Sequence, residues 1–183
     1  MSSPQLLKPI NTEKRYQVVA ATEQYIELAA GLFGREFAPI PVLFDLSGRA
    51  SGMYRVNGKA RQIRYNPYIF ARYFEDHLVA TVAHEVAHYI ADCLYGMANI
   101  KPHGVEWRAV MGSFGVEASR TFDHSLDGVP QRRYQRVAYR CDCGAHQLGI
   151  RRHNKVRRRQ AVYRCRRCQA VLVAMPTDPA VQE

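Results

Sequence analysis

The sequence contains no run of about 18 uncharged apolar residues, so it offers no segment as long as a membrane-spanning helix. Its first ten residues, MSSPQLLKPI, also lack the apolar core of a secretory signal peptide. We therefore expect a cytoplasmic protein, in which the five cysteines bind metal or stay free rather than form disulfides. No internal repeat or low-complexity tract is present, and an apolar content of 47% is typical of a folded globular protein.

Acidic residues are scarce in the last third of the chain. Residues 1–130 contain 13 Lys and Arg against 13 Asp and Glu, whereas residues 131–183 contain 13 against three. The formal net charge of +10 therefore lies entirely in the second segment, and the change follows a turn-rich stretch, SLDGVP, at residues 125–130. We predict a core over residues 1–130, a basic module over residues 131–175 and a flexible tail over residues 176–183.

The spacing of apolar residues predicts a mixed α and β fold in which helices pack on a small sheet. Helices are expected over about residues 11–33, 77–95 and 104–114, with a further helix opened by Asn66-Pro67. A buried strand is expected at residues 41–45, and two more, at 52–55 and 62–65, flank a hairpin turn at Asn57-Gly58. In the basic module, short strands are expected around residues 137–140, 147–152, 161–164 and 170–173, with a polar turn beginning at His153.

The motif H-E-V-A-H at residues 84–88 falls within the longest predicted helix. Residues four apart lie on one face of a helix, so His84 and His88 are able to bind one metal ion together. Glu85 projects beside them, where it can take a proton from a water bound to that metal. Zinc acidifies such a water and polarises a carbonyl, so the motif predicts zinc-dependent hydrolysis of peptide bonds.

A catalytic zinc needs a third protein ligand and one open coordination position. The candidates are His103, Glu106, Asp123 and His124. We favour His103, because it follows Pro102 and precedes a predicted helix, so a short loop can fold it back over the metal helix. Glu106 is the main alternative, since a Glu on a following helix completes some zinc peptidase sites.

Four cysteines in the basic module, Cys141, Cys143, Cys165 and Cys168, predict a structural zinc site. A segment of about 40 residues builds little core of its own, so a metal ion replaces the missing core. The one-residue gap between Cys141 and Cys143 is tighter than usual, and His146 is therefore a possible substitute for one of them. The fifth cysteine, Cys93, is expected to be a buried core thiol.

Arginine and lysine residues cluster around these cysteines and alternate with tyrosines, a pattern typical of nucleic-acid binding. No base-reading helix motif is present, so we expect contacts to the DNA backbone with weak sequence specificity. A basic surface without a dedicated partner is the simpler alternative. The predicted contact residues are Arg151, Arg152, Lys155, Arg157, Arg158, Arg159, Arg166 and Arg167.

Several motifs occur in the order found in the SprT family, which the chain resembles over about residues 15–174. They are H-E-V-A-H, H-G-V-E-W at residues 103–107, Y-R-C-D-C at 139–143, R-H-N at 152–154 and Y-R-C-R-R-C at 163–168. This family is related to the protease domain of Spartan, which degrades proteins crosslinked to DNA.

The resemblance implies an α+β, zincin-like metalloprotease core followed by a β-rich zinc ribbon. It also implies His84, His88 and His103 as zinc ligands and Glu85 as the general base. A nucleic-acid-binding or regulatory zinc protein with little proteolytic activity is the alternative, and a zinc hydrolase of non-peptide bonds is also compatible with these residues. The hairpin over residues 52–65 is either plain scaffold or an edge that holds substrate by strand addition.

Overall fold

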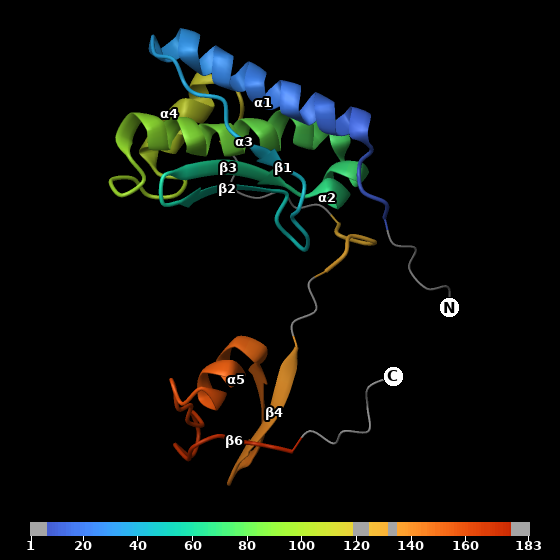
Figure 1. Ribbon diagram of the computed structural model, residues 1–183, viewed down its shortest axis with the longest axis vertical. Coiled ribbons are helices and arrows are strands. Elements are labelled where there is room, and N and C mark those ends of the chain that lie inside the picture. Colours follow the sequence, from blue (N-terminus) through green and yellow to red (C-terminus); the bar gives the residue numbers. More distant parts are fainter. Residues whose placement is uncertain (1–6, 119–124, 132–134, 177–183) are drawn as a thin grey trace. The chain divides into compact units, whose positions relative to one another are not determined.

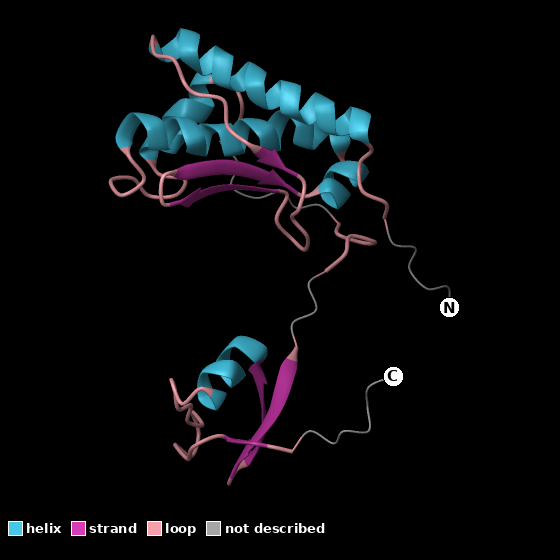
Figure 2. Cartoon of the chain, viewed as in Figure 1, coloured by secondary structure: helices cyan, strands magenta, loops and turns pink. Residues whose placement is uncertain are grey.

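The computed structural model describes residues 7–118, 125–131 and 135–176 (Figure 1). The chain divides into two compact units, Met1–Gln131 and Arg132–Glu183, which we call the N-terminal and C-terminal units. Helices and two small sheets make up these units, so the prediction of an α+β fold is confirmed (Figure 2). In the described part of the chain, no helix has both the length and the apolarity required to cross a membrane. The tail predicted at residues 176–183 falls almost wholly outside the described residues.

Two helices of the N-terminal unit, α1 and α2, begin at asparagines whose side chains cap them. Asn11 accepts a hydrogen bond of 2.9 Å from the Lys14 backbone N–H at the start of α1, and Gly34 ends this helix with a left-handed φ of 58°. Asn66 caps α2 in the same way, and Pro67 occupies its first turn. The four helices are α1 (Thr12–Phe33), α2 (Pro67–Arg72), α3 (Phe74–Tyr95) and α4 (Val105–Ser113).

A three-stranded sheet in the order β1-β3-β2 completes the N-terminal unit. It consists of β1 (Val42–Leu43), β2 (Gly52–Asn57) and β3 (Ala60–Tyr65); β1 is parallel to β3 and β2 is antiparallel to it. The prediction of a buried strand at residues 41–45 is wrong: only two residues pair, and Leu43 is 38% exposed. The reason is position, because β1 forms one edge of the sheet. The opposite edge is β2.

The hairpin between β2 and β3 turns one residue later than predicted. Asn57 pairs with Ala60, so Gly58 and Lys59 form the two-residue turn. Gly58 carries the positive φ of 60°, whereas Asn57 continues the strand. The turn therefore uses the glycine alone for the left-handed conformation that the Asn-Gly pair suggested.

Helix α3 is the central layer of the N-terminal unit, with the sheet on one side and α1 on the other (Figure 1). Its residues Val82, Val86 and Ile90 are fully buried in the core. The polar residues that the helix also buries include His77, Thr81, Glu85 and Asp92. Because burying unpaired polar groups is costly, these residues indicate that α3 has a role besides packing.

The C-terminal unit is built around a small antiparallel sheet in the order β5-β4-β6. Its elements are β4 (Arg136–Cys141), β5 (Gly144–Gly149), α5 (Ile150–Arg157) and β6 (Val173–Ala174). Its buried core consists of only Tyr139, Leu148, Cys165 and Leu172 among the described residues. A core this small supports the prediction that a metal ion helps to hold the unit together.

Helix α5 corrects the prediction of a strand at residues 147–152 and a turn from His153. Strand β5 ends at Gly149, whose extended backbone leads into the helix. Ile150, His153 and Val156 then lie on one half-buried helical face, and Tyr139 and His153 form a hydrogen bond of 3.0 Å. The expected strands at 161–164 and 170–173 are reduced to a single bridge between Arg164 and Val171, followed by β6.

Candidate functional site

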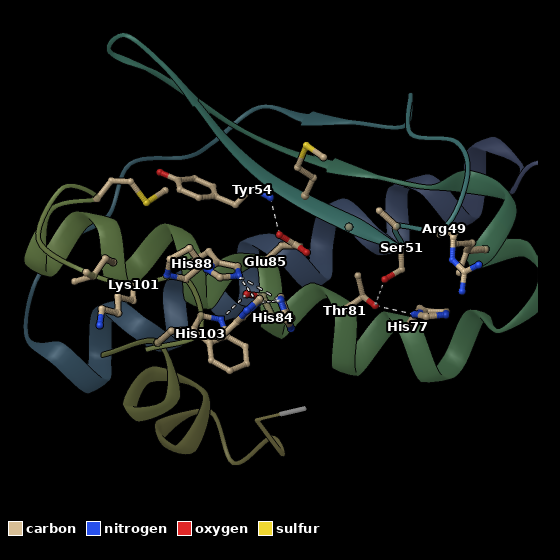
Figure 3. Close-up of a pocket in the computed structure, with 18 of the residues that line it drawn as sticks. Arg49, Ser51, Tyr54, His77, Thr81, His84, Glu85, His88, Lys101 and His103 are labelled. Carbon is tan, nitrogen blue, oxygen red and sulfur yellow. Dashed lines mark hydrogen bonds between the residues drawn. The ribbon is translucent and has the colours of Figure 1, made fainter. Parts of the chain in front are cut away.

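Three histidines of the N-terminal unit converge on one point (Figure 3). The Nε2 atoms of His84, His88 and His103 lie 3.0–3.2 Å from one another. His84 and His88 are one turn apart on α3, and His103 reaches them from the loop before α4. The structure thus brings together the three residues predicted as ligands.

The donor set fits a zinc ion. Three imidazole nitrogens bound to one tetrahedral zinc at about 2.0–2.1 Å would lie roughly 3.3 Å from one another, close to the spacing observed here. Burial, together with the neighbouring His84 and His103, lowers the pKa of His88 to about 3. His88 is therefore neutral at physiological pH, which is the form that binds metal.

His103 owes its position to a strained turn. Its φ is 56°, in the left-handed region that non-glycine residues rarely adopt. The Gly104 backbone N–H donates a hydrogen bond of 2.8 Å to the Lys101 carbonyl and closes the turn. Such strain is typical of functional sites, where the surrounding structure holds a side chain in place.

Trp107 of α4 packs against the rings of all three histidines. It is 1% exposed, and its indole N–H donates a hydrogen bond of 3.2 Å to the carbonyl of His84. Its ring centroid lies 4.7 Å from the rings of both His84 and His103, and its ring stacks on His88 at 5.5 Å. In the sequence, Trp107 stands out only as part of the family motif H-G-V-E-W. The signal available was a bulky aromatic residue four positions after His103.

Glu106, the main alternative for the third ligand, does not join the group. Glu106 turns toward the start of its own helix, where a Cβ on Gly104 would lie 2.9 Å from the Glu106 Oε2. Asp123 and His124 lie outside the described residues.

Glu85 lies beside the histidines and is 6% exposed. Burial disfavours its charged form and raises its pKa to about 8, although a hydrogen bond from the Tyr54 backbone N–H acts in the opposite direction. That hydrogen bond, to Oε2, is 2.6 Å long. Gly52 also lies against the carboxyl group, since a Cβ there would be 2.6 Å from both Cγ and Oε1 of Glu85.

A network two helical turns further along α3 fixes β2 against the helix. Asp92 accepts hydrogen bonds of 2.7 Å from the Tyr54 hydroxyl, from Nε of Arg61 and from the Met97 backbone N–H. Tyr54 therefore contacts α3 at both Glu85 and Asp92. This network could not be predicted from the sequence, because no local pattern relates a tyrosine on a strand to an aspartate 38 residues later.

A cavity of about 760 Å³ contains the three histidines and Glu85. Residues Arg49 to Tyr54 form one wall, and Met97 to His103 form part of another. In Figure 3, Arg49 and Lys101 lie at opposite ends of the cavity, with the histidines between them.

A second cluster of metal-binding side chains lies in the C-terminal unit. It consists of Cys141, Cys143, His146 and Cys165, whose ligand atoms all lie within 4.8 Å of one another. The sulfur of Cys141 is 3.4 Å from that of Cys143 and 3.0 Å from Nε2 of His146. Three sulfurs and an imidazole form a complete tetrahedral donor set of the kind found in structural zinc sites.

Cys168, predicted as the fourth ligand, also lies against this cluster, because its side chain forms hydrogen bonds with those of Cys141, Cys143 and Cys165. His146 joins the same three cysteines in the group of four, so His146 and Cys168 are both candidates for the fourth position. The backbone N–H groups of Cys168 and Arg167 lower the pKa of Cys165 by hydrogen bonding to its sulfur. Cys93, in the N-terminal unit, is half-buried against the core rather than fully buried.

All eight residues predicted to contact nucleic acid are exposed. Arg151, Arg152, Lys155 and Arg157 lie on α5, and the others follow it in loops. No ion pair links any of the eight to an acidic residue in the described part of the unit. Their positive charge is therefore available to an external partner.

Comparison with known proteins follows this division of the chain. Residues 22–135 match the SprT-like family, and residues 135–175 match the SprT-like zinc ribbon domain. Similar proteins named Protein SprT include one from Vibrio parahaemolyticus, 38% identical over 89% of this chain and 95% of its own length. One from Pseudomonas paraeruginosa is 37% identical, over 84% of this chain and 92% of its own. One from Serratia proteamaculans is 35% identical, over 88% and 92%.

Proposed function

The chain belongs to the SprT-like family, and from that premise we propose that it is a zinc metalloprotease acting on DNA-associated or DNA-crosslinked proteins. The observation that carries the proposal is the convergence of three histidine nitrogens beside a buried glutamate in one cavity. His84, His88 and His103 would hold the zinc ion and leave one coordination position open. When bound there, zinc would acidify water and polarise the scissile carbonyl.

Glu85 would act as the general base. Its Oε2 is occupied by the Tyr54 N–H, so Oε1 is the oxygen that would take a proton from the attacking water. A pKa near 8 suits a group that must hold this proton and then give it to the leaving amine. Gly52 leaves room for the carboxyl group to reach the water, because it places no side chain against it.

Strand β2 would hold the substrate backbone by strand addition. It is an edge of the sheet, and the Tyr54 N–H points toward Glu85 rather than toward β3. Because backbone groups alternate in an antiparallel ladder, Gly52 and Val56 also direct theirs away from β3. An extended peptide could therefore pair with this edge along the cavity.

The C-terminal unit would bind a second zinc ion and direct the enzyme to DNA. Its exposed arginines suit contacts to phosphate, and the Arg152 guanidinium lies 5.7 Å from the centre of the Tyr163 ring. Such contacts carry little sequence information, so binding would be led by the DNA backbone. This property suits an enzyme whose substrates are defined by their attachment to DNA.

The variant Glu85→Gln tests the enzymatic part of the proposal. It should keep the fold and zinc content but lose cleavage of a protein crosslinked to DNA, because the amide cannot accept the proton. Glu13→Gln, an exposed change in the first turn of α1, is the matched control and should cleave like the wild type. Equal cleavage by the wild type and Glu85→Gln would overturn the role of Glu85 as general base. No cleavage by either with DNA present would favour a DNA-binding zinc protein without protease activity.

DNA binding is tested separately by its dependence on salt. The slope of log affinity against log salt should fall by about 0.7–0.9 for each phosphate contact removed. A triple variant that replaces Arg157, Arg158 and Arg159 with Gln should flatten this slope, whereas Arg108→Gln on α4 should not. A wild-type affinity that hardly changes between low and high salt would contradict the proposed DNA interface.

A further inference from the structure

The proposed catalytic cavity carries an excess of positive charge. Glu85 is the only carboxylate among the described residues that line it, whereas Arg49 and Lys101 contribute cations at its two ends. The surrounding segment, residues 1–130, has no net charge. The cations in the cavity therefore do not follow from a generally basic surface, and their placement calls for a ligand of opposite charge.

The end of the cavity near Arg49 has a polar floor. His77 and Thr81, one helical turn apart on α3, are each 1% exposed, and His77 Nδ1 lies 2.7 Å from Thr81 Oγ1. The Thr81 hydroxyl also lies 3.4 Å from that of Ser51. Figure 3 shows these three residues at the end where Arg49 lies. Because Thr81 donates to Ser51, the Ser51 hydroxyl keeps its own proton for an oxygen atom that enters the cavity.

Apolar atoms line the same cavity. Ile69, which is 2% exposed, and Leu126 contribute apolar side chains to its lining. Arg49 stands three residues before Gly52, where the proposed docking strand begins. A side chain entering from a peptide on β2 would thus find both apolar and polar groups at this part of the cavity.

We propose that this end of the cavity is a subsite for an acidic side chain of the substrate, with Arg49 as the residue that determines specificity. The inference rests on the proposed function and adds a substrate class to it. The Arg49 guanidinium would pair with a Glu or Asp carboxylate, to which the Ser51 hydroxyl is placed to donate a hydrogen bond. A Lys or Arg at the same substrate position would be repelled.

Peptide cleavage measures this preference directly. In a series of C-terminally amidated peptides, Glu, Gln or Lys is placed in turn at each position flanking the scissile bond. The wild type should cleave the best Glu peptide about tenfold faster in kcat/KM than its Gln counterpart, as a charge-assisted hydrogen bond allows. Arg49→Gln should remove this difference while keeping the rate on the Gln peptide, and Arg49→Glu should favour Lys.

Arg108→Gln is the matched control, because Arg108 is exposed on α4 and lies outside the cavity lining. It should retain the wild-type preference for Glu. Equal rates of the wild type on the Glu, Gln and Lys peptides would overturn the subsite while leaving the protease activity intact.

Binding to the Glu85→Gln variant separates the subsite from catalysis, because no turnover is required. Calorimetry should show that the Glu peptide binds more tightly than the Gln peptide, and the Gln peptide more tightly than the Lys peptide. These differences in affinity should vanish in the double variant Glu85→Gln, Arg49→Gln. If the wild type cleaves nothing but this binding order is found, the protease proposal fails and the subsite stands.

A free C-terminal carboxylate and a DNA phosphate are also negatively charged, and two separate experiments distinguish them from an acidic side chain. Peptides with a free C-terminal carboxylate test whether the subsite reads a chain end. A single-stranded oligonucleotide, added as an inhibitor of peptide cleavage, tests whether DNA phosphate enters the cavity. Arg49 dependence confined to free C-termini, or to oligonucleotide inhibition, would overturn the assignment to an acidic side chain.

Discussion

Tyr54 donates its hydroxyl to Oδ2 of Asp92 at 2.7 Å, and its backbone N–H holds the Glu85 carboxylate at 2.6 Å. A single residue of β2 thus fixes the strand to α3 at two points separated by two helical turns. One point is the proposed general base, and the other is Asp92, a buried carboxylate that pairs with the exposed Arg61. Packing of the sheet on the helix and alignment of the catalytic group are therefore coupled through Tyr54.

Tyr54→Phe should weaken this attachment without breaking the site. The backbone N–H that holds Glu85 remains, but Asp92 loses one of its three hydrogen-bond donors. We expect the free energy of unfolding, measured in urea, to fall by about 1 kcal/mol. Zinc content should not change, and the loss of kcat should be smaller than that of Glu85→Gln. Loss of zinc on this substitution would contradict the assigned role.

Gly52→Ala should reduce activity through a clash. The new Cβ would lie 2.6 Å from Cγ and Oε1 of Glu85, so the carboxyl group must move. A displacement of about 1 Å at a catalytic group lowers kcat/KM on the order of 100-fold, and zinc should be retained. Gly31→Ala, on α1 with no atom within 4 Å of the added Cβ, should retain full activity. Wild-type activity of Gly52→Ala would show that this close approach has no catalytic consequence.

Asp92 predicts a component of the acid sensitivity of the fold. Burial alone would raise its pKa, but hydrogen bonds from Tyr54, Arg61 and the Met97 N–H outweigh burial and lower it. A carboxyl group with a lowered pKa stabilises the fold above its unfolded pKa of about 3.9, and this contribution disappears as the pH falls through its folded pKa.

Asp92→Asn should therefore lower the free energy of unfolding by about 2 kcal/mol at pH 7. This value lies between the losses typical of breaking an exposed ion pair and of breaking a buried one. The difference from the wild type should shrink as the pH falls below about 4. Asp45→Asn, which breaks the exposed pair with Arg64, is the control and should have a smaller effect. A difference that does not vary with pH would refute the ionic contribution.

His103→Ala should remove the zinc ion from the N-terminal unit, and Glu106→Ala should not. The affinity loss should exceed the roughly 10–100-fold typical of residues that only support a ligand. Total zinc per chain, measured by elemental analysis, is expected to fall from two ions to one for His103→Ala. The opposite pattern would make Glu106 the third ligand.

In the C-terminal unit, His146→Ala should weaken zinc binding more than Cys168→Ser does. The ligand atom of His146 lies within 4.8 Å of those of Cys141, Cys143 and Cys165, whereas Cys168 contacts the three cysteine side chains from an exposed position. Competition with a chelator measures both affinities, and loss of the ion should unfold this unit because its core is small. If only Cys168→Ser loses the ion, the four cysteines are the ligands.

Elements with local signals were predictable from the sequence. Asn66-Pro67 placed the start of α2 correctly, because a capping residue acts on its own turn, and the first helix was expected within a residue of its observed bounds. The i, i+4 spacing of His84 and His88 predicted their shared face for the same reason. His103 was the favoured third ligand on the basis of its loop, although its left-handed φ gave no sign in the sequence.

The features that sequence reasoning missed depend on contacts between distant residues. Tyr54 meets Asp92, and Trp107 lies against the histidines, only after the sheet and α4 have packed on α3. The segment that forms helix α5 was predicted as the end of a strand followed by a turn. It contains too few apolar residues to distinguish the 3.6-residue period of a helix from the two-residue period of a strand. His146 was named from the sequence as a substitute for Cys141 or Cys143, but its place beside both of them depends on the pairing of β5 with β4.

The open edge of β2 also bears on how the protein avoids self-association. An unpaired strand is a template for any extended chain, including the same strand of another copy. Here the edge is only six residues long, and its exposed positions alternate Met53, Arg55 and Asn57. Two strands meeting side by side would bring like charges at Arg55 together, which disfavours aggregation. The same short strand would thus accept a foreign peptide while discouraging stacking of the protein on itself.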